Sequence, residues 1–224
     1  MPAQQAILDW RNGLVPVSAR FDDPYFSLEN GLAETRHVFL GGNDLPARFR
    51  DGFRIAELGF GTGLNVLATV QAWIDSGTRG RLHLTSFEAF PMAAADMARA
   101  LAAFPALAAL AAPLLEMIGQ GATECCFPAG ATLRLVIGDA RQTLPAWEGQ
   151  ADAWYLDGFS PAKNPELWQP DLLEAVAAHT AAAGTVATYS AAGHVRRALA
   201  EAGFQVTRQP GYGRKRHMTR GVLA

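Results

Sequence analysis

The chain has almost no cysteine and little net charge, and both features exclude classes of protein. Its 224 residues include two cysteines, Cys125 and Cys126, which are neighbours and therefore poorly placed for a relaxed disulfide. The sequence has neither a C-x-x-C spacing nor a His/Cys cluster, the patterns that would indicate a zinc site. Neither a metal site nor a disulfide scaffold is therefore expected. This cysteine usage is typical of a reduced, cytoplasmic protein. The formal net charge of −2 argues against a protein that coats nucleic acid with its whole surface, so such a partner would require a local basic patch.

Long apolar runs are also missing. The N-terminus, MPAQQ, has no basic start followed by an apolar run, so no signal peptide is expected. The most membrane-like stretch, residues 100–118, is rich in alanine and broken by Pro105 and Pro113, which favours two buried or half-buried helices and no membrane partner. With 50% apolar residues the chain is suited to one globular domain with its own core.

From residue 53 to residue 224 apolar strands alternate with helical patterns, which is typical of an α/β domain with a mostly parallel sheet and helices on both faces. Seven strands are expected, at residues 53–58, 82–87, 132–137, 153–156, 185–189, 204–209 and 217–223. Helices are expected at residues 63–76, twice within 92–118, and at 170–182 and 193–202, with a helical turn at 142–145.

Residues 1–52 are rich in turn-forming and aromatic residues. We expect short strands or hairpin pieces followed by a helix near residues 44–49. Together they would form an N-terminal extension that covers the mouth of a site. A decorative edge hairpin is the alternative.

A glycine-rich turn follows the first strand of the expected sheet. Residues 56–65 read AELGFGTGLN and place Gly59, Gly61 and Gly63 at alternate positions. Such glycines let the backbone bend sharply and approach a nucleotide-like ligand, to which the next helix offers unpaired N–H groups. The spacing differs from the G-x-G-x-x-G dinucleotide fingerprint, and the carboxylate of Glu57 suits a cation better than a pyrophosphate. The alternative is that these glycines only form a tight turn and bind no ligand.

Four acidic residues fall at or one residue past the ends of expected strands. Ligands of open α/β sheets bind outside the carboxyl ends of the strands, so these side chains are expected at one edge of the sheet. They would repel one another unless a cation or hydrogen-bond donors shared the site. The alternative for each is a helix cap or a solvated loop residue. The four are Glu57, Glu88, Asp139 and Asp157.

The loop after the fourth strand, DGFSPAKNP at residues 157–165, places a carboxylate beside an aromatic ring. Asp157 is suited to orient an amine and draw off its proton, while Phe159 is suited to pack against an acceptor or a cation. The alternative is a proline-stiffened loop remote from any site.

The C-terminal section is basic. From residue 196 onward seven Lys and Arg residues oppose one acid, Glu201. Such a run can bind phosphates, although a solvated basic face is the usual alternative. The seven are Arg196, Arg197, Arg208, Arg214, Lys215, Arg216 and Arg220.

These motifs carry two resemblances. The ELGFGTG pattern resembles motif I of class I S-adenosylmethionine-dependent methyltransferases, whose cofactor is a sulfonium cation that also bears an ammonium group. The chain as a whole resembles the methyltransferase part of the bacterial tRNA 5-methylaminomethyl-2-thiouridine biosynthesis enzymes. The matching stretches are FDDPYFS at 21–27, NGLAETR at 30–36, VFLGGN at 38–43, DGFSPAKNPELW at 157–168, GHVRR at 193–197 and GYGRKR at 211–216.

The resemblance implies a class I, Rossmann-like methyltransferase fold with a seven-stranded sheet and a small N-terminal extension. It implies methyl transfer from S-adenosyl-L-methionine to the amine of 5-aminomethyl-2-thiouridine at the wobble position of tRNA, giving 5-methylaminomethyl-2-thiouridine. The FAD-dependent oxidase fused to many members does not lie within these 224 residues. The resemblance therefore implies a stand-alone enzyme or one domain of a larger protein, without bound FAD or metal. A separate oxidase acting upstream is then a candidate partner.

The resemblance also implies roles for individual residues. Glu88 is placed to accept hydrogen bonds from both ribose hydroxyls, Asp139 from the adenine amino group, and Glu57 from the methionine ammonium, directly or through water. The whole expected cofactor set is Glu57, Gly59, Phe60, Gly61, Gly63, Asn65, Glu88, Asp139 and Asp157.

The same resemblance implies that Asp157 and Phe159 are the catalytic candidates. Tyr25, Phe26, Lys163 and Trp168, together with the turn at 41–43, are expected to shape or border the acceptor pocket. The residues expected to meet the anticodon backbone are Arg196, Arg197, Arg214, Lys215 and Arg216.

Three other functions stay open on the sequence. The first is a methyltransferase for another amine, on a small molecule or a protein. The second is a non-catalytic nucleotide-binding or scaffolding module. The third is a dinucleotide oxidoreductase, which the glycine spacing and Glu57 disfavour.

Overall fold

The computed structural model describes residues 4–27 and 30–224. Within this part of the chain an eight-stranded sheet has the order β10-β11-β9-β8-β4-β5-β7-β6. The inner pairs β7/β5, β5/β4, β4/β8 and β8/β9 are parallel, whereas β6, β11 and β10 pair antiparallel to their neighbours. The strands are β4 (Phe53–Leu58), β5 (Leu82–Glu88), β6 (Glu124–Cys126), β7 (Ala131–Ile137), β8 (Ala151–Leu156), β9 (Thr180–Thr188), β10 (Phe204–Pro210) and β11 (His217–Leu223).

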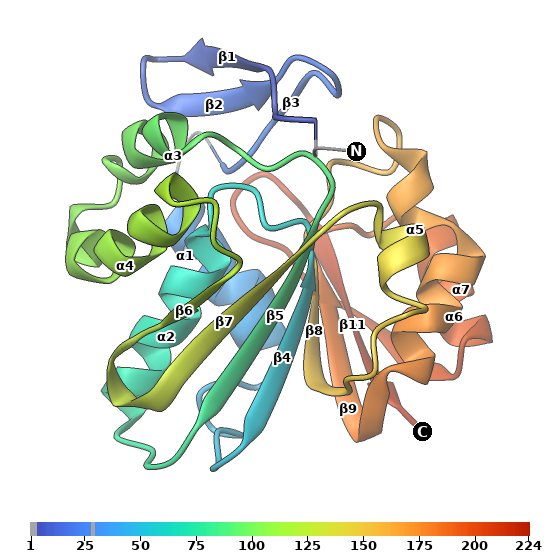
Figure 1. Ribbon diagram of the computed structural model, residues 1–224. Coiled ribbons are helices and arrows are strands. Elements are labelled where there is room, and N and C mark those ends of the chain that lie inside the picture. Colours follow the sequence, from blue (N-terminus) through green and yellow to red (C-terminus); the bar gives the residue numbers. More distant parts are fainter. Residues whose placement is uncertain (1–3, 28–29) are drawn as a thin grey trace.

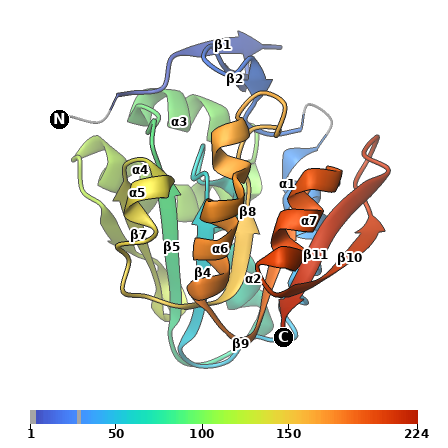
Figure 2. The ribbon, with the colours of Figure 1, turned by 90° about the vertical axis from the view of Figure 1, so that its right-hand side faces the viewer.

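Helices cover both faces of this sheet (Figures 1 and 2). One face carries α2 (Leu64–Ser76), α3 (Ala94–Leu101) and α4 (Ala108–Gly119), and the other carries α5 (Ala140–Thr143), α6 (Pro170–Ala178) and α7 (Gly193–Glu201). No single helix in the described ranges is long and apolar enough to cross a membrane, although α3 and the 105–119 segment, bent by 120°, pass the length and composition test as a pair.

The first strand shows why the sequence forms a sheet that is buried on both sides. Its residues FRIAEL are almost continuously buried. Phe53 and Ile55 join the apolar cluster on the α2 face, whereas Ala56 and Leu58 join the cluster on the α6 face. Because successive side chains of a strand point to opposite faces, a near-continuous apolar run is the pattern of a central strand.

The N-terminal segment confirms the expected short strands but not the expected helix. The strands β1 (Leu8–Arg11), β2 (Val15–Ser18) and β3 (Asp23–Pro24) form a small sheet that lies over the carboxyl ends of the main strands (Figure 1). They lead into α1 (Gly31–Thr35) and a π-helical turn, η1 (Arg36–Gly41), whose Val38–Leu40 stretch belongs to the core. The helix predicted at 44–49 is wrong: these residues form turns, and Asp44 has a left-handed φ of 55°, which interrupts a helix.

Two further expectations are corrected. The sheet has eight strands instead of seven, because β6 is a three-residue edge strand with partly exposed Cys and Glu side chains that carry no apolar pattern. The helix predicted at 170–182 ends at Ala178, and β9 already begins at Thr180. The alanines at 181–183 are good helix formers, but Thr180 pairs with Ala151 across the sheet and Ala183 takes a φ of 57°.

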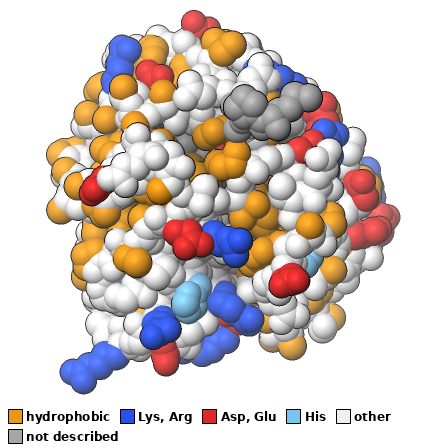
Figure 3. Space-filling view, viewed as in Figure 1, with side chains coloured by type: hydrophobic (Ala, Val, Ile, Leu, Met, Phe, Trp, Pro, Cys, Tyr) orange, Lys and Arg blue, Asp and Glu red, His pale blue; other side chains and the backbone are white. Residues whose placement is uncertain are grey.

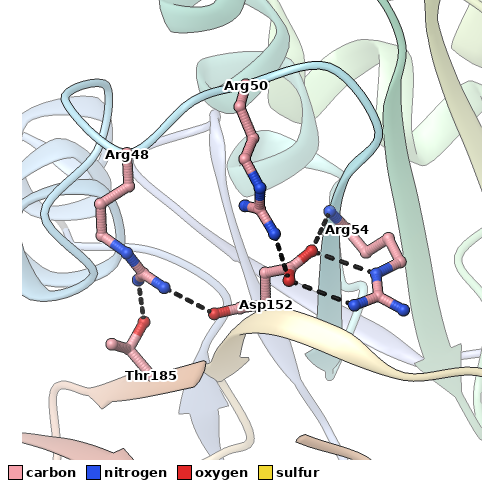
Figure 4. Close-up of polar contacts among 5 residues, drawn as sticks. All are labelled: Arg48, Arg50, Arg54, Asp152 and Thr185. Carbon is pink, nitrogen blue, oxygen red and sulfur yellow. Dashed lines mark hydrogen bonds and ion pairs between the residues drawn. The ribbon is translucent and has the colours of Figure 1, made fainter. Parts of the chain in front are cut away.

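An arginine cluster fastens the loop before β4 at the amino ends of the strands, opposite the small sheet. The Asp152 carboxylate accepts from Arg50 Nη2 at 2.9 Å and from Arg54 Nε at 3.1 Å, and its backbone oxygen accepts from Arg48 Nη2 at 3.1 Å (Figure 4). These contacts join the loop before β4 to the start of β8. Elsewhere, on the face in Figure 3, acidic and basic side chains are interspersed.

Candidate functional site

A cavity of about 1000 Å³ lies at the carboxyl ends of the parallel strands. Its walls come from the turn after β4, the ends of β5, β7, β8 and β9, and the hairpin between β10 and β11, and residues of the N-terminal segment 18–27 also line it. The position matches the rule for open α/β sheets, because β5 and β8 leave β4 in opposite directions and open a crevice between their ends. The volume is at the upper end of the range for small-molecule pockets.

The glycine turn brings the backbone against both sides of this crevice. Gly59 has a φ of 92° and its amide donates to Phe87 O at 3.0 Å, while a Cβ there would collide with the carbonyl oxygen of Asp157. Gly59 and Gly61 line the cavity, as expected. Gly63 does not line it: it precedes α2 with a φ of 75° and leaves room for Leu114.

Asn65 lines the cavity and links two of the predicted acids. Its Nδ2 donates to Glu57 Oε1 at 2.8 Å and to Asp157 Oδ2 at 2.7 Å, while its Oδ1 accepts from Thr35 Oγ1 at 2.8 Å. Ser86 Oγ donates to the other oxygen of Glu57 at 2.6 Å. Glu57 is therefore buried behind Asn65, whereas Asp157 reaches the cavity itself.

Three carboxyl groups of this region have raised pKa values. Burial raises the pKa of Glu57 to about 8 and that of Asp157 to about 7, against the hydrogen bonds from Asn65. Burial also raises the pKa of Glu88. Burial makes their ionised forms costly, and for Asp157 the charge of Lys215 offsets only part of that cost, so the site is electrostatically suited to a cationic ligand.

Glu88 and Asp139 meet different partners. Glu88 accepts from the amides of Gly61 at 3.0 Å and Phe90 at 2.7 Å. The Arg141 guanidinium, 2.6 Å from Asp139, holds the pKa of that carboxyl below its ordinary value. Asp139 also accepts from the Arg141 amide and so caps α5, but it still lines the cavity.

An aromatic cover, defined as Phe21, Tyr25, Phe90 and Phe159, closes the cavity towards the small sheet. Phe159 stacks on Phe21 with ring centroids 4.9 Å apart and meets the edge of Tyr25 at 5.0 Å. Phe21 meets Phe90 at 6.0 Å. The Asp23 carboxylate accepts from the Ser160 amide at 2.8 Å, which ties the N-terminal segment to the loop after β8.

The other residues expected around the acceptor lie in several places. Tyr25 and Phe26 line the cavity. Trp168 is buried, and its indole N–H donates to Phe159 O at 2.9 Å, so it shapes the loop from behind. Lys163 contacts the Asp22 carbonyl at the outer side of that loop. The turn at 41–43 was expected at the border but packs on the sheet, where Asn43 donates to Trp154 O at 3.3 Å.

The basic residues divide into two groups. Arg214 and Lys215 line the cavity, and Lys215 Nζ lies 2.8 Å from Glu34 Oε1. Arg196 is half-buried, and Arg197 and Arg216 are exposed outside the cavity. Desolvation and the positive charges of Arg208, Arg216 and Arg196 lower the pKa of His217.

Sequence reasoning missed several residues of the cavity. Tyr189 directly follows β9, so the strand-end signal that pointed to the acids also applied to it. Glu34 and Phe21 lie within the stretches NGLAETR and FDDPYFS, which carried the resemblance. Arg141 gave no signal, because its importance comes only from its contact with Asp139.

The donor set fits S-adenosyl-L-methionine. Glu88 is available to ribose hydroxyls, and Asp139 and the backbone of 59–61 line the same wall. The Asp157 carboxyl, with its raised pKa, provides negative charge for a sulfonium or ammonium group once it is ionised.

Comparisons with known proteins agree with this geometry. Residues 106–224 match the family described as S-adenosyl-L-methionine-dependent methyltransferase. The chain is 47% identical, over 98% of its length, to the tRNA 5-methylaminomethyl-2-thiouridine biosynthesis bifunctional protein MnmC of Stutzerimonas stutzeri, and 47% identical over 96% to that of a Caulobacter species. It spans 35% and 38% of the lengths of these relatives.

Solved structures give the same result for the fold. MNMC2 from Aquifex aeolicus superposes with a TM-score of 0.77 at 27% identity, covering 99% of this chain and 71% of that one. TrmN from Thermus thermophilus, with a TM-score of 0.54 and 18% identity, covers 92% of this chain and 52% of that one and shows the fold alone. The Rossmann-like methyltransferase fold expected from the sequence is thereby confirmed. Because the family match covers just over half of the residues and the cavity carries the matching donor set, the chain belongs to the S-adenosyl-L-methionine-dependent methyltransferases.

Proposed function

We propose that this chain transfers a methyl group from S-adenosyl-L-methionine to the exocyclic amine of 5-aminomethyl-2-thiouridine at the wobble position of tRNA. The observation that carries the proposal is the buried carboxyl of Asp157, held by Asn65 at the cavity wall beside the glycine turn. The likeness to the MnmC relatives over nearly the whole chain supports the choice of acceptor.

The cofactor would lie along the ends of β4, β5 and β7. Glu88 would bind the ribose and Asp139 the edge of the adenine. The backbone of Gly59, Phe60 and Gly61 would run alongside the cofactor. Glu57 and Asn65 would act from below, by fixing the position and charge of Asp157. When bound, the cofactor supplies an electrophilic methyl group on a sulfonium centre.

The acceptor amine would lie between Asp157 and Phe159. An amine is mostly protonated near neutral pH, and it must lose a proton before its lone pair can attack. Asp157, with a pKa raised to about 7 by burial, is suited to take that proton. The aromatic cover, whose rings pack on one another, would exclude water and hold the reacting groups in line. Alignment and desolvation are the larger part of the work in a displacement at a methyl group.

The tRNA backbone would run over the basic residues outside the cavity, Arg196, Arg197 and Arg216, and reach Arg214 and Lys215 at its rim. Such contacts to phosphates position the substrate without reading its sequence. On this proposal the protein works in the cytoplasm with tRNA, and a separate FAD-dependent oxidase produces the free aminomethyl group.

The test is nucleoside mass analysis. Purified protein is incubated with the cofactor and with tRNA that bears the aminomethyl group, and the wobble nucleoside is expected to gain one methyl group. Matched tRNA without the aminomethyl group should stay unmodified. A methyl group that appears elsewhere in the tRNA, or no transfer at all, would refute the proposed acceptor.

A further inference from the structure

Lys215 places a primary ammonium group at the rim of the cavity. Its Nζ lies 2.8 Å from Glu34 Oε1 and 4.0 Å from the centroid of the Tyr189 ring. A carboxylate and an aromatic face are the two groups that proteins use to hold an ammonium cation. Glu34, Tyr189 and Lys215 all line the cavity that Asp157 also lines.

Glu34 and Tyr189 belong to fixed parts of the fold. Glu34 lies in α1, which Asn30 caps by accepting from the Ala33 amide at 2.9 Å, and the side chain of Glu34 is 13% exposed. The Tyr189 hydroxyl donates to Gly158 O at 2.7 Å, next to Asp157, and its ring meets Trp168 edge-on at 6.4 Å. The backbone that carries Glu34 and the ring of Tyr189 are therefore positioned by contacts that do not involve Lys215.

Lys215, in contrast, comes from the hairpin between β10 and β11, and its side chain is 45% exposed. Its backbone amide donates to Tyr212 O at 3.0 Å within the hairpin itself. A lysine ammonium on a long flexible stem can leave such a position without breaking any core contact.

We propose that Glu34 and Tyr189 form the recognition site for the ammonium group of the methyl acceptor, and that Lys215 occupies this site until the acceptor displaces it. The inference rests on the proposed function and adds to it the residues that select a cationic amine. Exchange of one ammonium for another keeps the largely buried carboxylate of Glu34 paired at every stage, which avoids the cost of an unpaired charge.

The exchange also orders the reaction. The acceptor first enters as an ammonium ion between Glu34 and Tyr189. It then reaches the position between Asp157 and Phe159 in the same cavity, where it gives one proton to ionised Asp157. The free lone pair forms the new N–C bond, while the C–S bond of the methyl donor breaks and its electron pair stays on sulfur. The displaced Lys215 ammonium is then free to meet a backbone phosphate, so that tRNA docking and amine entry favour one another.

The test compares two nucleosides, 5-aminomethyluridine and its neutral counterpart 5-hydroxymethyluridine, by equilibrium binding in the presence of S-adenosylhomocysteine, which prevents turnover. Wild-type protein should prefer the amine. Glu34→Gln should lower this preference about tenfold, the size expected for one charge-assisted hydrogen bond. Lys215→Met should strengthen binding of the amine several-fold and change the neutral compound less, because the internal competitor is removed.

Glu166→Gln is the matched control, since Glu166 also lines the cavity, whereas the carboxylate that pairs with Lys215 among the described residues is that of Glu34. It should keep the wild-type preference. Binding of S-adenosylhomocysteine reports that each variant is folded. An unchanged preference in Glu34→Gln, or equal weakening of both nucleosides in Lys215→Met, would overturn the proposal.

An assay of methyl transfer into aminomethyl-bearing tRNA distinguishes failure of the proposed function from failure of the proposed ammonium site. If the wild-type protein transfers no methyl group, the proposed function fails. If it transfers methyl groups and Glu34→Gln discriminates amine from hydroxymethyl as well as wild type does, only the ammonium site fails.

Discussion

At the scale of single residues, Asn65 organises the acidic site. One amide nitrogen carries two protons, and here each proton goes to a different carboxyl group, Glu57 and Asp157. Thr35 donates to the amide oxygen and so fixes which end of the side chain faces the acids. The arrangement holds Asp157 at the cavity wall with one oxygen engaged and leaves the other oxygen to a ligand.

Asp157→Asn tests the role of this carboxyl. The variant keeps the shape of the side chain and one oxygen that can accept from Asn65, but it cannot accept a proton from the acceptor amine. We expect the rate of methyl transfer to fall about 100-fold or more, the range for loss of a general base. Affinity for S-adenosylhomocysteine, measured by calorimetry, should change only a few-fold. Exposed Asp171→Asn on α6 is the control, and full activity of Asp157→Asn would contradict the assignment.

The sequence predicted this site to the level of strand ends and not further. The positions of Glu88, Asp139 and Asp157 follow from the ends of three strands, because parallel strands bring those ends together. That Glu57 lies behind Asn65 could not be predicted, because it depends on how α2 packs against β4 and β8. The contact of Lys215 with Glu34 joins residues 181 positions apart, which no local pattern reports.

At the scale of elements, the small N-terminal sheet and the loop after β8 act as one cover. Phe21 and Tyr25 contact Phe159, and Asp23 accepts from Ser160, so the two segments fix one another over the cavity. The aromatic side chains that join the two segments, Phe21, Tyr25 and Phe159, are only partly buried.

Phe21→Ala tests whether this cover serves catalysis. Loss of the stacked ring should weaken the cover by about 0.5–1.5 kcal/mol, which raises KM for the acceptor roughly two- to tenfold. Trp10→Ala is the control, because Trp10 belongs to the small sheet but packs against another residue. Its ring lies under the Arg99 guanidinium, whose Cζ is 3.9 Å from the ring centroid. Steady-state kinetics with tRNA would measure both variants, and equal effects of the two would mean that only the stability of the small sheet matters.

The boundaries of the helices and strands show where prediction from local sequence patterns succeeds and where it fails. The strands β4, β5, β7 and β8 were predicted within two residues because they are long, apolar and flanked by clear turns. The helix predicted at 44–49 was wrong because Asp44 takes a left-handed conformation, and the start of β9 was wrong because Thr180 already pairs with Ala151 across the sheet. Both residues make tertiary contacts, which a local window does not include.

At the scale of the whole molecule, the fold buries carboxyl groups whose negative charge the cationic methyl donor is suited to compensate. Glu57, Glu88 and Asp157 have pKa values raised by burial, so the folded, ligand-free protein binds protons more tightly than the unfolded chain. The stability that they contribute is present at low pH and is lost as the pH rises through their folded values, up to about 8 for Glu57. A bound cation lowers these pKa values and removes part of the loss.

Thermal unfolding as a function of pH tests this coupling. Without ligand, Tm should fall between about pH 5 and pH 8, and the increase in Tm caused by S-adenosyl-L-methionine should grow over the same interval. Glu57 alone accounts for a change on the order of 2–4 kcal/mol in the free energy of unfolding. Glu57→Gln should therefore flatten the pH dependence, whereas Glu174→Gln, at an exposed position of α6, should leave it unchanged. Equal slopes for wild type and Glu57→Gln would show that the buried carboxyl is ionised throughout, and that Asn65 and Ser86 satisfy its charge without the donor.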